Sequence, residues 1–262
     1  MTTAAMHIAR TGLDAQNQRM RVISNNLANV NTTGFKRDRA AFETLSYQTV
    51  TANGAPSTAE TRYATGLNLG TGVRIQGTAR IETQGTLAQT GNSLDLALDG
   101  DGYFQVQLPG GQLGYTRAGN FARSPEGLLV TSEGYQVLPG IAIPPGATQI
   151  TIGSDGTVSV SVQGQPQPVQ AGQLQVATFQ NAAGLQPIGE NYLAETAGSG
   201  PVQVGIAGIE GRATIRQGML EGSNVNVVEE LVDMIETQRA YEVNSKMISA
   251  TDQMLQYANQ NL

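Results

Sequence analysis

The fold of this chain is decided by the stretch Ser223-Asn-Val-Asn-Val-Val-Glu-Glu-Leu-Val-Asp-Met-Ile-Glu-Thr-Gln-Arg-Ala-Tyr-Glu242, which opens a helical pattern that continues to Leu262. Asn226 and Glu229 have the spacing of a capping box, in which two side chains bond the backbone donors at the start of a helix. No Gly or Pro follows Asn226. Because those two residues are the common helix breakers, the stretch predicts one long C-terminal helix.

Apolar residues lie along this predicted helix in two stripes. The first stripe consists of Val228, Leu231, Val232, Ile235, Val243, Met247, Ala250 and Met254. The second stripe repeats every seven residues and consists of Val227, Met234, Tyr241, Ile248 and Leu255. A helix with one apolar face packs against one neighbour, so two stripes predict neighbours on two sides.

The N-terminus carries a matching helical pattern. Its main seam, at spacings of three and four residues, consists of Met6, Ala9, Leu13, Gln16, Met20, Ile23, Leu27 and Val30, and a weaker line of Ile8, Ala15 and Val22 lies beside it. We expect this helix to end within residues 29–34, where Gly34 suits a left-handed cap. The two terminal helices are expected to pair as a coiled coil and to keep apolar surface for other chains. The alternative is a two-helix cap on an ordinary core.

The middle of the chain has the pattern of β structure. Residues 66–204 alternate short β-type runs with turn signals about every ten residues, which is typical of an all-β domain. Before it, Tyr47, Val50 and Tyr63 are the large apolar residues of a polar stretch around Asn53-Gly54, which predicts an extended β-hairpin or, alternatively, a flexible linker. The predicted class is α+β, with an N-terminal helix at 1–35, an extended connector at 36–82, an all-β body at 83–204, a return connector at 205–222 and a C-terminal helix at 223–262.

Composition excludes several classes of function. The net charge of -6, without a basic cluster, leaves no electrostatic footprint for nucleic acid or an anionic membrane. The chain has no cysteine and one histidine, His7, so thiolate metal sites and common nucleophilic sets lack their residues. We therefore predict no cofactor, no metal and no enzymatic activity.

Two charged segments are open to more than one interpretation. Asp95, Asp99 and Asp101 suggest a calcium loop, but the spacing of an EF-hand fails, and we interpret Asp95 as an outward strand residue beside a hairpin turn. The segment 35–39, which contains Lys36, is expected to be a solvated segment with local ion pairs. The opening residues lack the basic and apolar regions of a signal peptide, and no apolar run is long enough to span a bilayer.

Two long motifs resemble those of a known family. The stretch Ser24-Asn-Asn-Leu-Ala-Asn-Val-Asn-Thr-Thr-Gly-Phe-Lys36 resembles the N-terminal signature of the bacterial flagellar rod and hook proteins, and residues 223–246 are similar to their C-terminal signature. The match continues through shorter motifs such as Asp99-Gly-Asp-Gly-Tyr-Phe104. The signature positions carried over are Asn26, Leu27, Asn29, Thr33, Gly34, Phe35, Asn224, Asn226, Glu229, Gln238, Arg239 and Tyr241.

The resemblance implies a self-assembling structural subunit of the flagellar drive shaft, located in the basal body where the rod crosses the periplasm and exported without a cleaved signal peptide. The implied partners are further copies of the chain in a helical polymer, the proximal rod proteins, the hook protein, the periplasmic and outer-membrane bushing rings, and the flagellar type III export apparatus. Proximal rod and hook proteins share both signatures and are the competing assignments. A secreted β-rich binding module that dimerises through a coiled coil is the alternative from another class.

Overall fold

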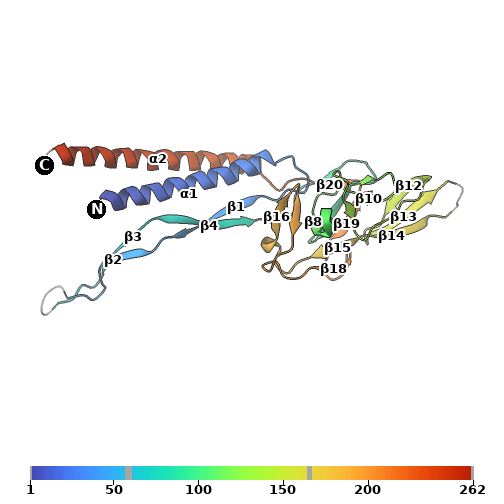
Figure 1. Cartoon of the computed structure of the whole chain (residues 1–262), viewed down its shortest axis with the longest axis horizontal. Helices are drawn as coiled ribbons and strands as arrows, with labels where there is room; N and C mark the ends of the chain where they lie inside the picture. The colour runs from blue at the N-terminus through green and yellow to red at the C-terminus, as the bar shows by residue number, and fades with distance from the viewer. Residues whose placement is uncertain (1, 57–60, 164–166, 261–262) are drawn as a thin grey trace. The chain divides into compact units, whose positions relative to one another are not determined.

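The computed structural model describes residues 2–56, 61–163 and 167–260. The fold is α+β, with an N-terminal helix, a mostly β central part and a C-terminal helix (Figure 1). The chain divides into two compact units. The helical unit consists of Met1–Leu27, Asp38–Ala79 and Asn226–Leu262, and the β unit consists of Ala28–Arg37 and Arg80–Val225.

In the helical unit, α1 (Thr2–Ala28) and α2 (Val227–Gln260) lie side by side and antiparallel (Figure 1). The predicted cap of α2 is present, because Asn226 Oδ1 accepts a hydrogen bond from the Val228 N–H at 3.1 Å. Helix α1 ends at Ala28, one residue before the range 29–34 in which its end was expected, because Asn29 starts a turn in which its carbonyl accepts from the Thr32 N–H at 3.2 Å. Gly34 has the expected left-handed backbone, with a φ of 70°, but it lies beyond this turn.

Two pairs of strands complete the helical unit. Strand β1 (Asp38–Thr44) pairs with β4 (Val73–Arg80), and β2 (Tyr47–Thr51) pairs antiparallel with β3 (Leu67–Gly70). Helix α1 meets β4 where the Val73 N–H donates to Thr11 Oγ1 at 3.4 Å. Within the range 36–82, predicted to be an extended connector with a long hairpin, the segments 38–44, 47–51, 67–70 and 73–80 thus form paired strands, and β4 contacts α1.

The predicted turn at Asn53-Gly54 is present, but the strands do not reverse there. The Ala55 N–H bonds to the Ala52 carbonyl at 3.1 Å, and Gly54 has a φ of 78°, so residues 52–55 form a turn. The antiparallel pairing nevertheless continues beyond it to a bridge between Pro56 and Arg62. Asn53-Gly54 is thus a bend within the paired segment.

The β unit is built from four sheets. The largest has nine strands in the order β16-β17-β8-β7-β11-β10-β9, with β15 pairing β7 and β18 pairing β15. Its strands are β7 (Tyr103–Gln107), β8 (Leu113–Thr116), β9 (Ala122–Arg123), β10 (Leu129–Val130), β11 (Gln136–Val137), β15 (Gln175–Thr178), β16 (Gln186–Gly189), β17 (Tyr192–Ala194) and β18 (Gln203–Ile206). The others join β12 (Ala147–Ile152), β13 (Thr157–Val162) and β14 (Val169–Gln173), then β6 (Leu96–Asp99) with β19 (Thr214–Gln217), and β5 (Leu87–Gln89) with β20 (Met219–Glu221).

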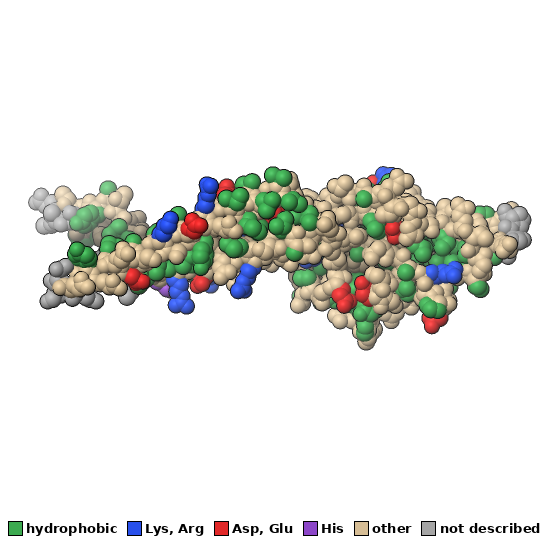
Figure 2. Space-filling model, turned by 90° about the horizontal axis from the view of Figure 1, so that it is seen from above, with side chains coloured by type: hydrophobic (Ala, Val, Ile, Leu, Met, Phe, Trp, Pro, Cys, Tyr) green, Lys and Arg blue, Asp and Glu red, His purple; other side chains and the backbone are tan. Residues whose placement is uncertain are grey.

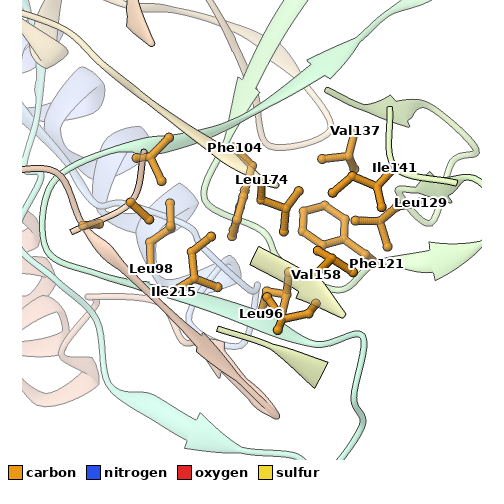
Figure 3. Close-up of a cluster of buried hydrophobic side chains, with 14 of the residues drawn as sticks. Leu96, Leu98, Phe104, Phe121, Leu129, Val137, Ile141, Val158, Leu174 and Ile215 are labelled. Carbon is orange, nitrogen blue, oxygen red and sulfur yellow. The ribbon is translucent and has the colours of Figure 1, made fainter. Parts of the chain in front are cut away.

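The larger of two apolar clusters joins the nine-stranded sheet, the β12–β14 sheet and the β6–β19 pair. Side chains alternate along the strands, and those that point inward from different sheets meet around Leu98, Phe104 and Ile215 (Figure 3). Phe104 and Phe121 stack edge to face with ring centroids 5.0 Å apart. Residues 205–222, expected to be a return connector, belong to the body, because Ile215 is buried in this core and the segment supplies β19 and β20.

Candidate assembly surface

The first predicted stripe of α2 lies on the outside of the helical unit. Its large members are between 42% and 70% exposed, namely Val228, Leu231, Val232, Ile235, Val243, Met247 and Met254. Figure 2 shows hydrophobic side chains gathered over the helices on the face seen there. Single exposed apolar residues are common, but a row of this length, interrupted at Gln238 and Arg239 between Ile235 and Val243, marks an interaction surface.

The second predicted stripe lies partly covered at the flank of the contact between the helices. Met234 and Ile248 are half-buried, whereas Val227 and Tyr241 are about two-fifths exposed, and the side chain of Leu255 is outside the described part of the chain. Sequence reasoning missed the residues at the centre of the contact. Among the described side chains of α2, the buried ones are Glu230, Thr237 and Thr251. Glu230, Thr237, half-buried Asn244 and Thr251 recur every seven residues, and this polar repeat is the sequence signal that could have indicated the side of α2 that faces α1.

Helix α1 contacts α2 and strand β4, and the residues of its predicted seam are buried or half-buried. Ala9 and Ile23 are buried, while Met6, Leu13, Gln16, Met20, Leu27 and Val30 are half-buried. In the weaker line, Ala15 is buried and Ile8 is 39% exposed. Arg19 pairs with Asp233 of α2 at 3.1 Å, on the side facing the other helix.

The residues proposed for the hairpin are mostly exposed. Tyr47, Val50 and Tyr63 are 61%, 60% and 48% exposed. Asn53 has a local structural role, because its Oδ1 accepts from the Gly66 N–H at 2.6 Å, and the Gly54 N–H donates to the Tyr63 carbonyl at 3.0 Å. The structure therefore brings two bending residues and three exposed apolar side chains into one paired segment.

Several signature residues tie the two connector segments of the β unit to each other. The Gly34 N–H donates to the Glu221 carbonyl at 2.8 Å, and Asn224 Oδ1 accepts from the Arg37 N–H at 2.7 Å. The Asn224 N–H donates to the Phe35 carbonyl at 3.4 Å, and its side-chain amide donates to the Ile81 carbonyl at 2.8 Å.

Other signature residues lie either beside these two connector segments or on the exposed surface of α2. A Cβ on Gly34 would lie 2.6 Å from the Ala118 backbone nitrogen, so this position requires glycine. The Asn29 carbonyl accepts from the Thr32 N–H and its side-chain Oδ1 from the Thr32 hydroxyl, while the Thr33 carbonyl accepts from Asn191 Nδ2. Glu229, Gln238, Arg239 and Tyr241 are exposed on α2.

Lys36 is buried, which corrects the expectation of a solvated segment. Its Nζ donates to Glu221 Oε1 at 2.6 Å and to the Thr83 carbonyl at 2.8 Å. Arg117 approaches the other oxygen of Glu221 at 3.3 Å, and all three side chains are at most 5% exposed. Burial lowers the pKa of the Lys36 ammonium from its usual 10.5, and the hydrogen bond to Glu221 opposes this shift. The partner lies 185 positions away in sequence, so no local pattern could reveal it.

Tyr103 extends this buried ionic network. The Arg117 guanidinium lies 5.3 Å from the centre of its ring, and the phenol donates to Glu82 Oε2 at 2.8 Å. Burial raises the pKa of the Tyr103 phenol, and the negative charge of Glu82 raises it further. Charges and aromatic rings thus hold the junction in place.

The three aspartates that suggested calcium have other partners. Asp95 is buried and not outward-facing, and its carboxylate accepts from Thr90 Oγ1 at 2.6 Å and Asn92 Nδ2 at 3.0 Å. Asp99 pairs with Arg216 at 2.7 Å, and Asp101 forms a backbone bridge with Arg212. Over residues 2–56, 61–163 and 167–260, no group of three acidic or histidine side chains is placed to hold a metal ion. In the same ranges neither helix has the length and apolar character needed to cross a membrane.

Comparison with known proteins gives one consistent family. Three family models match, described as "Flagella basal body rod protein" over residues 6–36, "Flagellar hook protein FlgE/F/G D1 domain" over 97–160, and "Flagellar basal body rod FlgEFG protein C-terminal" over 216–261. A flagellar basal-body rod protein FlgG of Buchnera aphidicola is 53% identical over 98% of both chains.

Two relatives from one bacterium allow a finer comparison. In Caulobacter vibrioides, a flagellar basal-body rod protein FlgG is 47% identical over 98% of both chains. A flagellar basal-body rod protein FlgF of the same organism is 37% identical over 92% of this chain and 90% of the relative. The similarity is therefore greater to the protein named FlgG.

Proposed function

Because the chain belongs to the family of flagellar basal-body rod proteins and is a structural subunit of that rod, we propose that its copies build the distal segment of the rod. In this proposal the copies form a rigid tubular shaft that transmits torque from the motor to the hook. The greater identity to the FlgG relative than to the FlgF relative of the same bacterium supports a distal over a proximal place. The near-complete coverage of the FlgG relatives supports a rod subunit over a hook subunit.

The exposed row on α2 is the observation that carries the proposal. Fully burying a Val, Leu, Ile or Met side chain contributes about 1.5–3 kcal/mol relative to leaving it exposed. Seven such side chains in one row supply enough apolar surface to join subunits. We propose that the terminal helices pair as a coiled coil within each subunit and that this row packs against the helices of neighbouring copies.

The paired strands β2 and β3 supply a second proposed contact. Tyr47, Val50 and Tyr63 are exposed apolar residues in a segment that is otherwise polar. An extended hairpin here would anchor these side chains on a neighbouring copy along the shaft. Such a contact would resist the sliding between neighbours that lets a tube bend.

The wider partners follow from the place in the rod. As a rod subunit, the chain assembles with other rod and hook components in the basal body. The proposed neighbours are the proximal rod proteins on one side, the hook protein on the other, and the bushing rings around the shaft where it crosses the periplasm. Delivery by the flagellar type III export apparatus, without a cleaved signal peptide, is part of the same proposal.

The test places a charge in the exposed row. Ile235 is 51% exposed in the subunit, so Ile235→Asp leaves the subunit folded, but the charge loses its water if the row is covered on assembly. We expect the variant to form no rods, as judged by electron microscopy of basal bodies, while its circular dichroism matches that of the parent chain. Ile235→Leu and Ser245→Asp, the second on a different side of α2, serve as matched controls. Normal rods from Ile235→Asp would refute the proposal.

A further inference from the structure

The contact between α1 and α2 is polar at its centre, whereas the more apolar side of α2 faces away. Among the side chains of α2 that the structure describes, every buried one is polar, and these are Glu230, Thr237 and Thr251. Val228 and Val232 lie two residues before and after Glu230, and two residues are about half a turn of an α-helix. They are 70% and 51% exposed. A helix packed by apolar burial alone would present the opposite side to its partner.

Asn26 and Glu230 form the specific contact in this seam. Asn26 Nδ2 donates to the two carboxyl oxygens of Glu230 at 3.3 and 3.2 Å, and both residues are at most 4% exposed. The same amide is held in place by strand β1, because it donates to the Asp38 carbonyl at 2.9 Å and accepts from the Asp38 N–H at 3.0 Å. Strand β1 thus fixes the Asn26 side chain in the position from which it binds Glu230 of α2.

The rest of the seam permits close approach without adding apolar attraction. The hydroxyls of Thr237 and Thr251 donate to the carbonyls of Asp233 and Met247 in their own helix at 2.6 and 2.8 Å. At Gly12 of α1, an added Cβ would lie 3.1 Å from Asn244 Nδ2. The small and internally bonded groups of this seam do not favour one orientation of α2 over another. Two polar contacts do, namely the partly exposed Arg19–Asp233 ion pair and the buried Asn26–Glu230 pair, and the buried pair is the more demanding because neither side chain can turn to water instead.

We propose that the Asn26–Glu230 pair is an orientation lock that turns the polar side of α2 toward its own α1 and keeps the apolar row available for a second copy. A buried polar pair can fix helix register at some cost in stability, because the alternative packing leaves a polar group buried without its partner. Without the lock, α2 rotates about its axis and buries part of its apolar row within its own chain. This inference rests on the proposed role of the row in assembly.

The chain contains no cysteine, so a pair of introduced cysteines reports the orientation directly. Gly12→Cys with Asn244→Cys probes the native orientation, and Gly12→Cys with Val243→Cys probes a rotated one, since Val243 is 58% exposed. Mild oxidation of the dilute full-length chain is followed by counting intramolecular disulfides by mass spectrometry. We expect the first pair to form at least about tenfold more than the second, which corresponds to about 1.4 kcal/mol.

The lock is then removed by Asn26→Ala combined with Glu230→Ala, which deletes both polar groups without adding an apolar contact between the two positions. We expect the preference to fall to about threefold or less, or to reverse, whereas Glu230→Gln retains it because its amide oxygen still accepts from Asn26. An unchanged preference in the double alanine variant would overturn the lock, as would equal yields from the two pairs in the parent chain. The assay uses isolated subunits, so failure of the assembly proposal would appear in Ile235→Asp and not here.

Discussion

Replacing Glu221 with Gln tests whether the buried ionic network holds the β unit together. The change removes the one carboxylate that faces both Lys36 at 2.6 Å and Arg117 at 3.3 Å, while the shape of the side chain is kept. Breaking a buried ion pair by removing one partner costs about 3–5 kcal/mol, because the remaining charge stays buried. In a unit of this size, 1 kcal/mol lowers the melting temperature by about 2–4 °C, so a fall of roughly 6–20 °C is expected.

The loss should depend on pH in a defined direction. Burial already lowers the pKa of Lys36 below 10.5, and removal of Glu221 deletes the stronger of the two carboxylates, Glu221 and Glu82, that oppose this shift. In the variant, the unfolded chain therefore binds the lysine proton more strongly than the folded chain does, so stability rises with pH up to about 10.5. The difference in the free energy of unfolding between Glu221→Gln and the parent chain should therefore become smaller from pH 7 to pH 10.

The measurement is urea unfolding of the full-length chain, followed by near-ultraviolet circular dichroism of the buried tyrosines. Glu126→Gln is the matched control, because Glu126 is exposed and the substitution changes the same charge. The control should remain within about 0.5 kcal/mol of the parent, as surface substitutions usually do. If Glu221→Gln also stayed within that limit, the network would not contribute as an ionised cluster, and the argument would be wrong.

Three further changes probe the junction and the paired strands. Gly34→Ala should destabilise the β unit by about 1–3 kcal/mol in thermal melts, because its φ is 70° and its Cβ would meet Ala118, and an unchanged melt would contradict this. The raised pKa of Tyr103 means that the folded chain holds the phenol proton more tightly, so its contribution is present below pH 10 and lost above it. Tyr103→Phe should therefore flatten the loss of stability between pH 10 and 11 in urea titrations, and an equal slope would count against this cause. Deleting 46–64 should give rods that assemble but curve in electron micrographs of basal bodies, whereas straight rods would show that the segment is only a linker.

Local patterns in the sequence predicted the helices and the cap well. Asn226 caps α2, as its spacing from Glu229 indicated, and Val228 and Ile235 belong to one exposed apolar row. Such features depend on neighbours within a few positions, so the sequence contains the whole signal. The α+β class followed from the change between helical and strand periodicity.

Features that depend on distant partners could not be predicted in the same way. Lys36 was expected in solvent because it lies in a charged segment, yet Glu221 makes its burial possible from 185 positions away. Asp95 alternates with two leucines as an exposed strand residue would, but it is buried where its backbone bridges to Asn120 and its carbonyl accepts from the Gly218 N–H. On α2, apolar residues were expected to face α1, whereas the pairing of Glu230 with Asn26 places a polar row there.

Direct hydrogen bonds join the two connector segments of the β unit, residues 34–37 and 221–224. Gly34 is bonded to Glu221, and Arg37 to Asn224, directly through the backbone or a single side chain. A pull applied to either connector passes to the other across these bonds, so the strands around Phe104 and Val158 are not stretched in series with it. Changes in the sequence or loop lengths of the sheets should therefore leave the stiffness of the Gly34–Glu221 and Arg37–Asn224 junction unchanged. The residues that set this stiffness are thus different from the residues that form the surface of the β unit.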